Sequence, residues 1–259
     1  MKHMKLFLEF QKYMAVRLLL AFSIIALGGY SSLNWMNMSI NDFTSIKKMQ
    51  KHYVVKNWES KELSVLDSRP QTWTSLSSLN SSQYMAIVIS EDWSFFDHKG
   101  IDSEQLQIAL VDFMMGEPLR GASTISQQLV KNLFTDADRS LKRKVKEFIL
   151  TKYLEENVSK EKILETYLNN IQYGKDIYGI SDAARFYFNK SAQEMNTKEW
   201  SFMAMLLPNP VRYASSYRER KLTDYAVEKI STLLFKLKVA KVIDYHKLLE
   251  YQELPIRFK

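Results

Sequence analysis

Apolar residues recur at helical spacing over most of this chain. From Gln83 almost to the end, hydrophobic positions follow one another at three- and four-residue intervals. The 259 residues include only 7 glycines and 5 prolines, which favours helices over a turn-rich β architecture. The pattern therefore predicts a mostly α fold whose body starts near Gln83.

Helix-start signals divide this body into segments. Thr124 and Gln127 have the spacing of a capping box, so we expect a helix from Ser123 or Thr124 to about Leu133. On that helix Gln127 and Lys131 should share a face. A second capping box at Asn196 and Glu199 should begin a later helix.

The segment between these two boxes predicts two further helices. The first should span roughly 139–156, with a chemical face and an apolar stripe of Leu141, Val145, Phe148 and Ile149. The second runs through 163–169. The helix begun at Asn196 should stop at Pro208-Asn209-Pro210, and residues 222–250 should add one or two terminal helices with no evident chemistry.

The N-terminal region predicts export to a membrane surface. Residues 18–41 carry no charge and their first half is strongly apolar, which indicates a membrane anchor over 18–40. The basic residues within 1–17 should keep that segment cytoplasmic. A cleaved signal peptide and a buried soluble helix are the alternatives. Residues 41–75 mix charged and polar positions, and we expect them to form a connector. The sequence Ser68-Arg69-Pro70-Gln71 and the serine-rich run to Ser82 predict an extended segment or a short hairpin.

Charge and composition narrow the chemistry only partly. The formal charge of +7 suggests an anionic partner such as nucleic acid, anionic lipid or a phosphorylated substrate. The absence of cysteine removes disulfides and cysteine nucleophiles. Two Ser-x-x-Lys matches, at Ser45 and Ser159, lack any Lys-Thr-Gly, so penicillin-type acyl chemistry is rejected.

Three clusters carry candidate chemistry. Glu91 and Asp92 end an apolar segment, where burial can make one carboxylate a base, although a plain acidic helix start is the alternative. His98 fits a turn-fixing residue better than a proton carrier. The basic run from Arg139 to Lys146 can be a solvated face or an anion site, and it lacks the interleaved aromatics of a nucleic-acid surface.

Five ordered segments resemble the family 51 peptidoglycan glycosyltransferases. They are Glu91-Asp-Trp-Ser-Phe-Phe-Asp-His-Lys-Gly100, Gly121 to Asn132, Arg139 to Glu147, Ile163 to Asn169 with Gly174, and Ala183 to Lys190 running on to Glu199 and Pro210. The short chain with a single anchor is similar to the monofunctional biosynthetic transglycosylases. The resemblance implies a lysozyme-like glycosyltransferase domain over 76–221, closed by C-terminal helices at 222–259. It also places a membrane-embedded jaw at the apolar stretch Leu106 to Met115, which favours lipid contact there over the alternative of core packing.

The resemblance also assigns roles to residues. It makes Glu91 the general base that deprotonates the acceptor 4-hydroxyl, with Glu147 as the second catalytic acid residue. It implies contacts to the donor sugars and pyrophosphate from Ser123, Thr124, Gln127, Gln128, Lys131, Asn132, Arg139, Arg143 and Lys144. It leaves structural or supporting roles to Asp92, Phe95, His98 and Gly100.

Cofactors and partners follow from the same resemblance. No cofactor is required and no metal ligand is assigned, but Glu147 can either orient the neighbouring cations or help to hold Mg²⁺ or Mn²⁺ near the pyrophosphate. The implied partners are lipid II, the lipid-linked glycan chain, membrane lipid and other cell-wall synthesis proteins, with no nucleic acid. Gln107 and Asn189 depart from the common pattern, which puts only peripheral substrate contacts in doubt.

The expected protein is therefore a single-pass enzyme of the inner membrane with its catalytic domain on the periplasmic side. It would join lipid II into β-1,4 glycan by inverting displacement and release undecaprenyl diphosphate. Two alternatives stay open. One is a lysozyme-like wall hydrolase, which shares a glutamate on an α scaffold. The other is an inactive membrane scaffold of the wall-synthesis machinery.

Overall fold

The computed structural model describes residues 38–105, 107–108, 115, 123–135, 138 and 140–259. Most of the predicted anchor and jaw, together with Gly121 and Arg139, lies outside these residues. Within the described residues, no helix is both long enough and apolar enough to cross a membrane.

The described chain is mostly helical, as its periodicity predicted. Its N-terminal part contains α2 (Ile40–Met49), β1 (Tyr53–Lys56), β2 (Leu63–Leu66), the 3₁₀ turn η1 (Leu76–Ser78) and α3 (Ser81–Glu91). The middle of the chain contains α5 (Ile125–Phe134), α6 (Leu141–Asn157), α7 (Lys160–Asn170), β3 (Gln172–Gly174), β4 (Ile177–Tyr178) and α8 (Ile180–Phe188). The remainder contains η2 (Ala192–Glu194), α9 (Thr197–Leu206), α10 (Pro210–Tyr213), α11 (Ser215–Arg218), α12 (Asp224–Val239) and α13 (Tyr245–Glu253).

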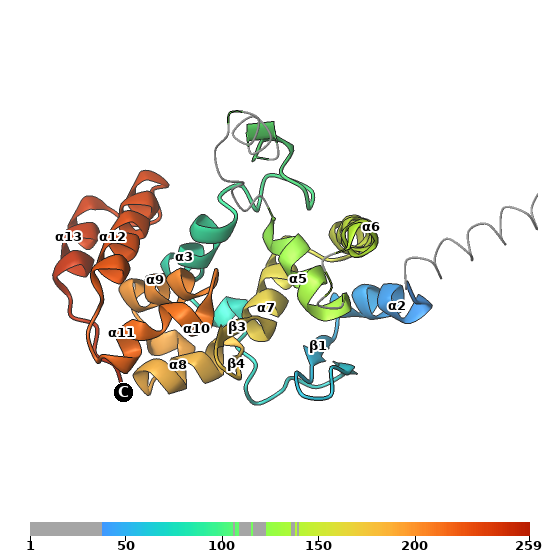
Figure 1. Cartoon of the computed structure of the whole chain (residues 1–259), viewed down its shortest axis with the longest axis horizontal. Coiled ribbons are helices and arrows are strands. Elements are labelled where there is room, and N and C mark those ends of the chain that lie inside the picture. Colours follow the sequence, from blue (N-terminus) through green and yellow to red (C-terminus); the bar gives the residue numbers. More distant parts are fainter. Residues whose placement is uncertain (1–37, 106, 109–114, 116–122, 136–137, 139) are drawn as a thin grey trace, which may run out of the picture.

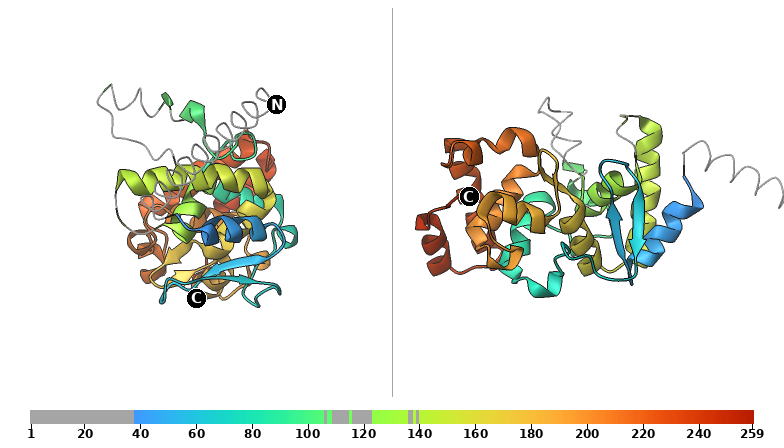
Figure 2. Two further views of the ribbon diagram at one scale, coloured as in Figure 1. Left: turned by 90° about the vertical axis from the view of Figure 1, so that its right-hand side faces the viewer. Right: turned by 90° about the horizontal axis from the view of Figure 1, so that it is seen from below.

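These elements form an elongated body with the hairpin and the terminal helices at opposite ends (Figure 1). The helices α5 and α7 lie between the two ends, and the same separation is visible from below in Figure 2. Helices α12 and α13 pack against each other, and both contact α9. The terminal helices therefore belong to the same packed body as α3 and α9.

Helix α9 forms the centre of one half of the core. Every residue from Thr197 to Leu206 is buried, and the helix packs against α3 and α12. Its predicted capping box is confirmed, because Asn196 Oδ1 accepts from the Glu199 backbone N–H while Glu199 Oε2 accepts from the Asn196 N–H. The Lys190 ammonium also forms an ion pair with Glu199 Oε1 at 2.7 Å. A helix buried on all sides thus keeps its polar start satisfied.

The capping box at Thr124 and Gln127 is likewise confirmed as the start of α5. The helix predicted over 139–156 is present as α6, but its apolar stripe was predicted wrongly. Leu141 and Phe148 are exposed, whereas Lys146, Glu147 and Leu150 are buried. Lys146 is buried because its ammonium meets Asp42 of α2 at 3.0 Å, an ion pair that hydrophobic periodicity cannot reveal.

One departure from the common pattern, Asn189, is explained by the local backbone. It ends α8 in the left-handed conformation at φ +55°, and its N–H donates to the Arg185 carbonyl. Asparagine is the residue after glycine that tolerates this conformation best, so it can replace glycine at a helix end. The substitution therefore preserves the local backbone.

The segment expected to be a connector contains ordered elements that pack on the body. Ile46 and Met49 of α2 and Val54 of β1 are fully buried. Strands β1 and β2 pair antiparallel, with Tyr53 opposite Leu66 and Lys56 opposite Leu63. Asn170, the last residue of α7, fixes this hairpin by donating to the Val54 carbonyl at 2.9 Å and accepting from the Lys56 N–H at 3.2 Å.

We predict that Asn170→Ala destabilises the domain by about 1–3 kcal/mol, because two backbone groups of β1 lose their buried partner. Urea unfolding measures this loss, and hydrogen exchange of the Lys56 amide, which loses its acceptor, should accelerate. The control is Asn157→Ala, which removes one local bond to the Tyr153 carbonyl and should cost less than about 0.5 kcal/mol. Equal losses in the two variants would contradict the anchoring role of Asn170.

Candidate active site

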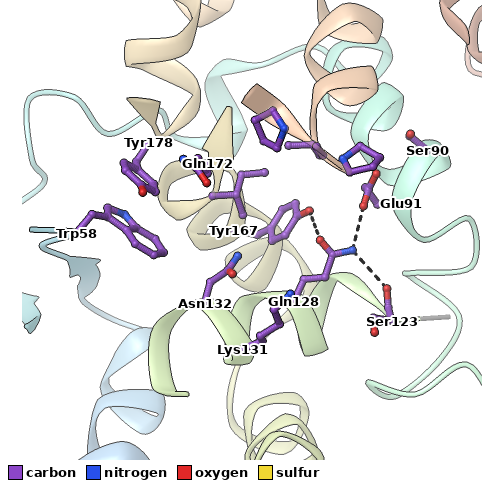
Figure 3. A pocket seen from close by; sticks show the side chains of 14 residues that line it. Trp58, Ser90, Glu91, Ser123, Gln128, Lys131, Asn132, Tyr167, Gln172 and Tyr178 are labelled. Atoms are coloured by element: carbon purple, nitrogen blue, oxygen red, sulfur yellow. Dashed lines mark hydrogen bonds between the residues drawn. The ribbon is translucent and has the colours of Figure 1, made fainter. Parts of the chain in front are cut away.

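Glu91 is the last residue of α3, and its carboxylate is oriented by the side chain of Gln128 on α5. Gln128 Nε2 donates to Glu91 Oε2 at 3.0 Å and also approaches the Ser123 carbonyl at 3.3 Å (Figure 3). Tyr167 of α7 donates its hydroxyl to Gln128 Oε1 at 2.8 Å. Because the Ser123 carbonyl can only accept, the amide nitrogen of Gln128 must face Ser123 and Glu91. Three helices therefore set the position of one carboxylate.

The surroundings of Glu91 favour its protonated form. Burial is the largest cause and raises the pKa of the Glu91 carboxyl above its ordinary value of 4.5, with a smaller increase from the nearby Asp92 charge. The Gln128 hydrogen bond partly offsets this by lowering the pKa. Burial also raises the pKa of Tyr167 well above its ordinary value, so its hydroxyl keeps its proton and stays a donor. The site thus holds a carboxylate that takes up protons more readily than one in water.

Two cavities meet at Glu91. The first, of about 590 Å³, is lined by Trp58, Ser90, Glu91, Ser123, Gln128, Lys131, Asn132, Tyr167, Ile171, Gln172, Tyr178, Leu207, Pro208 and Pro210. The second, of about 410 Å³, is lined by Ile89, Ser90, Glu91, Asp92, Trp93, Asp102, Gln105, Ser123, Thr124 and Lys236. Ser90, Glu91 and Ser123 are common to both. A carboxylate shared by two cavities can act on a group that one bound molecule presents to another.

Asp92 is buried beside Glu91 but faces a different set of groups. Its Oδ2 accepts from the Ile125 N–H at 2.9 Å, at the first turn of α5, and its Oδ1 meets His98 Nε2 at 2.9 Å. The Gly100 N–H donates to His98 Nδ1 at 3.1 Å, so Nε2 carries the ring proton and donates it to Asp92. Asp92 therefore joins α3 to the start of α5 and fixes the intervening turn.

Gly100 and Phe95 complete this structural cluster. Gly100 has φ +84°, and a Cβ there would lie 2.9 Å from the side chains of both Thr151 and Glu155 on α6. The Gly100 carbonyl accepts from the Thr124 hydroxyl at 2.7 Å. Phe95 is fully buried, with the Lys160 ammonium 4.3 Å from its ring centroid. These residues hold the loop after α3 against α5 and α6.

The residues predicted on α5 divide between the cavity and the core. Ser123, Gln128, Lys131 and Asn132 line the first cavity. Gln127 does not line either cavity, because its side chain is buried in the capping box, where Oε1 accepts from the Thr124 N–H at 3.0 Å. Thr124 is the N-cap of α5 and also borders the second cavity.

The predicted residues on α6 form an ion cluster that lines neither cavity. Arg143 Nη1 donates to Glu147 Oε2 at 2.8 Å, and the Lys144 ammonium pairs with Glu147 Oε1. Glu147 is almost fully buried, while the Lys144 side chain is 45% exposed. Both carboxylate oxygens of Glu147 are therefore already paired with cationic side chains. Among the described residues, no group of three or more histidine, cysteine, aspartate or glutamate side chains could hold a metal ion.

Sequence reasoning missed several residues at the cavities. Tyr167 stood within a quoted motif without a role, and Trp58 and Tyr178 gave no signal beyond being aromatic. Lys236 of α12 lines the second cavity, although no chemistry was expected after residue 222. These positions are distant in sequence and are brought together only by tertiary packing. Gln107, the other departure, is exposed and lines neither cavity.

A mostly helical domain with an oriented, partly buried glutamate between polar cavities is an arrangement suited to enzymes that cleave or transfer glycans. Comparisons with known proteins identify which class is present. A family profile described as "Transglycosylase" matches residues 59–237. This chain belongs to that family, the family 51 peptidoglycan glycosyltransferases, which confirms the resemblance of its five motifs.

Individual relatives support the same assignment. The biosynthetic peptidoglycan transglycosylase of Acinetobacter baylyi is 37% identical over 186 residues, which are 71% of this chain and 76% of that protein. The protein of the same name from Acinetobacter baumannii (strain ACICU) is 34% identical over 216 residues, 82% of this chain and 92% of the relative. Penicillin-binding protein 1A from Haemophilus influenzae matches 52% of this chain and 16% of its own chain at 21% identity. Its TM-score of 0.32 is too low to bear on the fold.

We predict that Asp92→Ala destabilises the domain by about 2–4 kcal/mol, because the Ile125 N–H and the His98 ring lose a buried anionic acceptor. Chemical denaturation measures the change in the free energy of unfolding. Asp97→Ala is the matched control, since Asp97 is exposed in the same loop. A loss no larger than that of the control would show that Asp92 does not hold the loop and α5 together.

We predict that ionisation of the Glu91 carboxyl lowers the free energy of unfolding as the pH rises. Because the pKa of its carboxyl is higher in the folded than in the unfolded protein, the folded state favours the protonated form. Stability is therefore lost as pH rises from the unfolded pKa through the folded pKa. Glu91→Gln should remove this loss, so its free energy of unfolding should exceed that of the wild type at pH 7.5 and the gain should shrink at pH 4.

Urea unfolding at the two pH values measures this difference. Glu228→Gln, on the exposed surface of α12, controls for the general effect of removing one negative charge. A gain for Glu91→Gln that is independent of pH, or equal to that of the control, would contradict the prediction.

Proposed function

We propose that this protein is a peptidoglycan glycosyltransferase with a lysozyme-like domain that joins lipid II into β-1,4-linked glycan strands and releases undecaprenyl diphosphate. The observation that carries the proposal is the position of Glu91. Its carboxylate is oriented by Gln128, has a raised proton affinity, and borders both cavities. Family membership supports the reaction class, and the position of Glu91 supports its role as the base.

The second cavity is the proposed site of the acceptor lipid II. There Glu91 removes the proton from the acceptor 4-hydroxyl as its oxygen attacks the anomeric carbon of the donor. The new C–O bond forms on the face opposite the leaving pyrophosphate, so the anomeric centre is inverted. A carboxylate with a pKa above its ordinary value is a stronger base than an exposed glutamate, which matches this role.

The first cavity is the proposed site of the donor, the lipid-linked glycan chain. Lys131 supplies positive charge to this cavity, and Ser123, Gln128 and Asn132 supply hydrogen-bonding groups. The undecaprenyl pyrophosphate departs with the electron pair of the broken bond, so the protein must neutralise charge rather than protonate an oxygen. Arg139, Arg143 and Lys144 are proposed to add to this neutralisation, with Glu147 holding the latter two in place.

The Glu91 environment also bears on the hydrolase alternative. A lysozyme-like hydrolase would use a protonated glutamate to assist a sugar leaving group, and the raised pKa of Glu91 alone fits that role too. The lysine beside the first cavity and the cations of α6 favour transfer from a pyrophosphate, because hydrolysis of a neutral glycan needs neither. An inactive scaffold would not need a carboxylate held by three helices.

The proposed location is the periplasmic face of the inner membrane, with residues 18–40 as a single-pass anchor. The support is the uncharged stretch 18–41 after a basic N-terminal segment. Helix α2 begins at Ile40, within the last residues of this stretch, and Ile40 is 82% exposed. Membrane lipid is the proposed neighbour of this end, and other cell-wall synthesis proteins are proposed partners.

We predict that Glu91→Gln lowers the polymerisation rate on purified lipid II by about 10²-fold or more, because the amide cannot accept the acceptor proton. Gel-resolved glycan formation measures the rate, with and without a chelator of divalent cations. Circular dichroism confirms that the variant folds, and Glu228→Gln serves as the active control.

Three results would overturn the proposal or part of it. Near-wild-type polymer from Glu91→Gln would exclude Glu91 as the base. Release of soluble fragments from purified wall polymer, without polymer from lipid II, would make the protein a hydrolase. Lipid II binding without turnover, under conditions where a related enzyme polymerises, would make it a scaffold.

A further inference from the structure

We propose that Trp58 and Tyr178 form a binding wall for sugar rings of the growing glycan chain. Both residues line the first cavity, and Figure 3 places them at the opposite end from Glu91. This proposal rests on the function proposed above, because it assigns the wall to the lipid-linked donor. It adds a subsite that lies away from the reacting carbons.

The two aromatic side chains stack face to face, so each covers one ring face of the other. Their rings are stacked, with centroids 4.2 Å apart and planes inclined by 9°. They come from different elements, since Trp58 follows β1 in the hairpin and Tyr178 is the last residue of β4. Each ring is partly exposed, so each retains surface that faces the cavity.

The hairpin is built to hold Trp58 in this place. Asn170 binds two backbone groups of β1, as described above, and the Lys56 ammonium donates to the Asn132 carbonyl at the end of α5 at 2.7 Å. The Lys56 and Lys61 ammonium groups lie 5.1 Å and 5.8 Å from the Trp58 ring centroid. Trp58 is therefore positioned before any ligand arrives, which lowers the entropy cost of binding.

The chemistry of this end of the cavity suits a β-linked glycan. Pyranose rings present C–H faces that pack on aromatic surfaces, and hydroxyl and acetamido groups at their edges need hydrogen-bonding partners. Gln172 and Asn132 supply such partners within the same cavity. A lipid tail would leave these amides unsatisfied, so the wall fits sugar better than hydrocarbon.

This placement has a specific functional consequence. When the donor's anomeric carbon lies beside Glu91, the rest of its chain must extend away from the acceptor. A wall at the far end of the cavity would bind sugars already joined to the chain. It would therefore retain the growing strand between additions and increase glycan length.

The test compares Trp58→Ala and Trp58→Phe with the wild type, using Tyr245→Ala as the control because Tyr245 is 63% exposed on α13. On lipid II, Trp58→Ala should give shorter glycan than the wild type, and Trp58→Phe should restore much of the length. Calorimetry with lipid-free glycan oligosaccharides should show roughly tenfold weaker binding when Trp58→Ala is added to Glu91→Gln. Thermal unfolding checks that each variant is folded.

The outcomes separate this proposal from the function on which it rests. Unchanged glycan length and unchanged oligosaccharide binding in folded Trp58→Ala would overturn the wall and leave the polymerase assignment intact. No measurable binding of oligosaccharide to the Glu91→Gln protein would also overturn it. If the wild type makes no polymer, the proposed function fails, and the binding comparison alone decides whether the wall holds glycan.

Discussion

The hydrogen bonds of the Asp92 carboxylate are the interaction on which the geometry of the site depends. It accepts from the first turn of α5 and from His98, so the end of α3, the loop through Gly100 and the start of α5 share one buried anion. An anion at a helix N-terminus is favoured by the unpaired N–H groups there. Gln128 lies on the first turns of α5. The hydrogen bond between Asp92 and the start of α5 therefore also sets where the Gln128 amide meets Glu91.

The adjacent acids Glu91 and Asp92 thus differ in their hydrogen-bond partners. The buried Asp92 carboxylate accepts from a backbone N–H and a ring N–H, whereas the partly buried Glu91 receives one amide hydrogen bond, and burial raises the pKa of its carboxyl. Close packing thus gives two neighbouring carboxylates different surroundings. The folded chain accepts the less favourable environment of Glu91 because neighbouring contacts hold α3 and α5 in register.

Local signals in the sequence predicted the helices well, since capping boxes at Thr124 and Asn196 depend only on residues three apart. They also identified the family and, through it, the cavity residues Glu91, Gln128, Lys131 and Asn132. The burial of Lys146 and Glu147 could not be predicted, because it depends on ion pairs within α6 and with α2. The stacking of Trp58 on Tyr178 joins residues far apart in the chain, so no local pattern reveals it.

The hydrogen bond from Gln128 to the Ser123 carbonyl has a further consequence for the site. An amide can rotate by half a turn and exchange its donor and acceptor ends, but a backbone carbonyl can only accept, so this contact allows one orientation. The Tyr167 hydroxyl, which can donate or accept, fits that orientation by donating to Gln128 Oε1. Glu91 therefore always meets a donor at this contact, whatever the protonation state of its carboxyl.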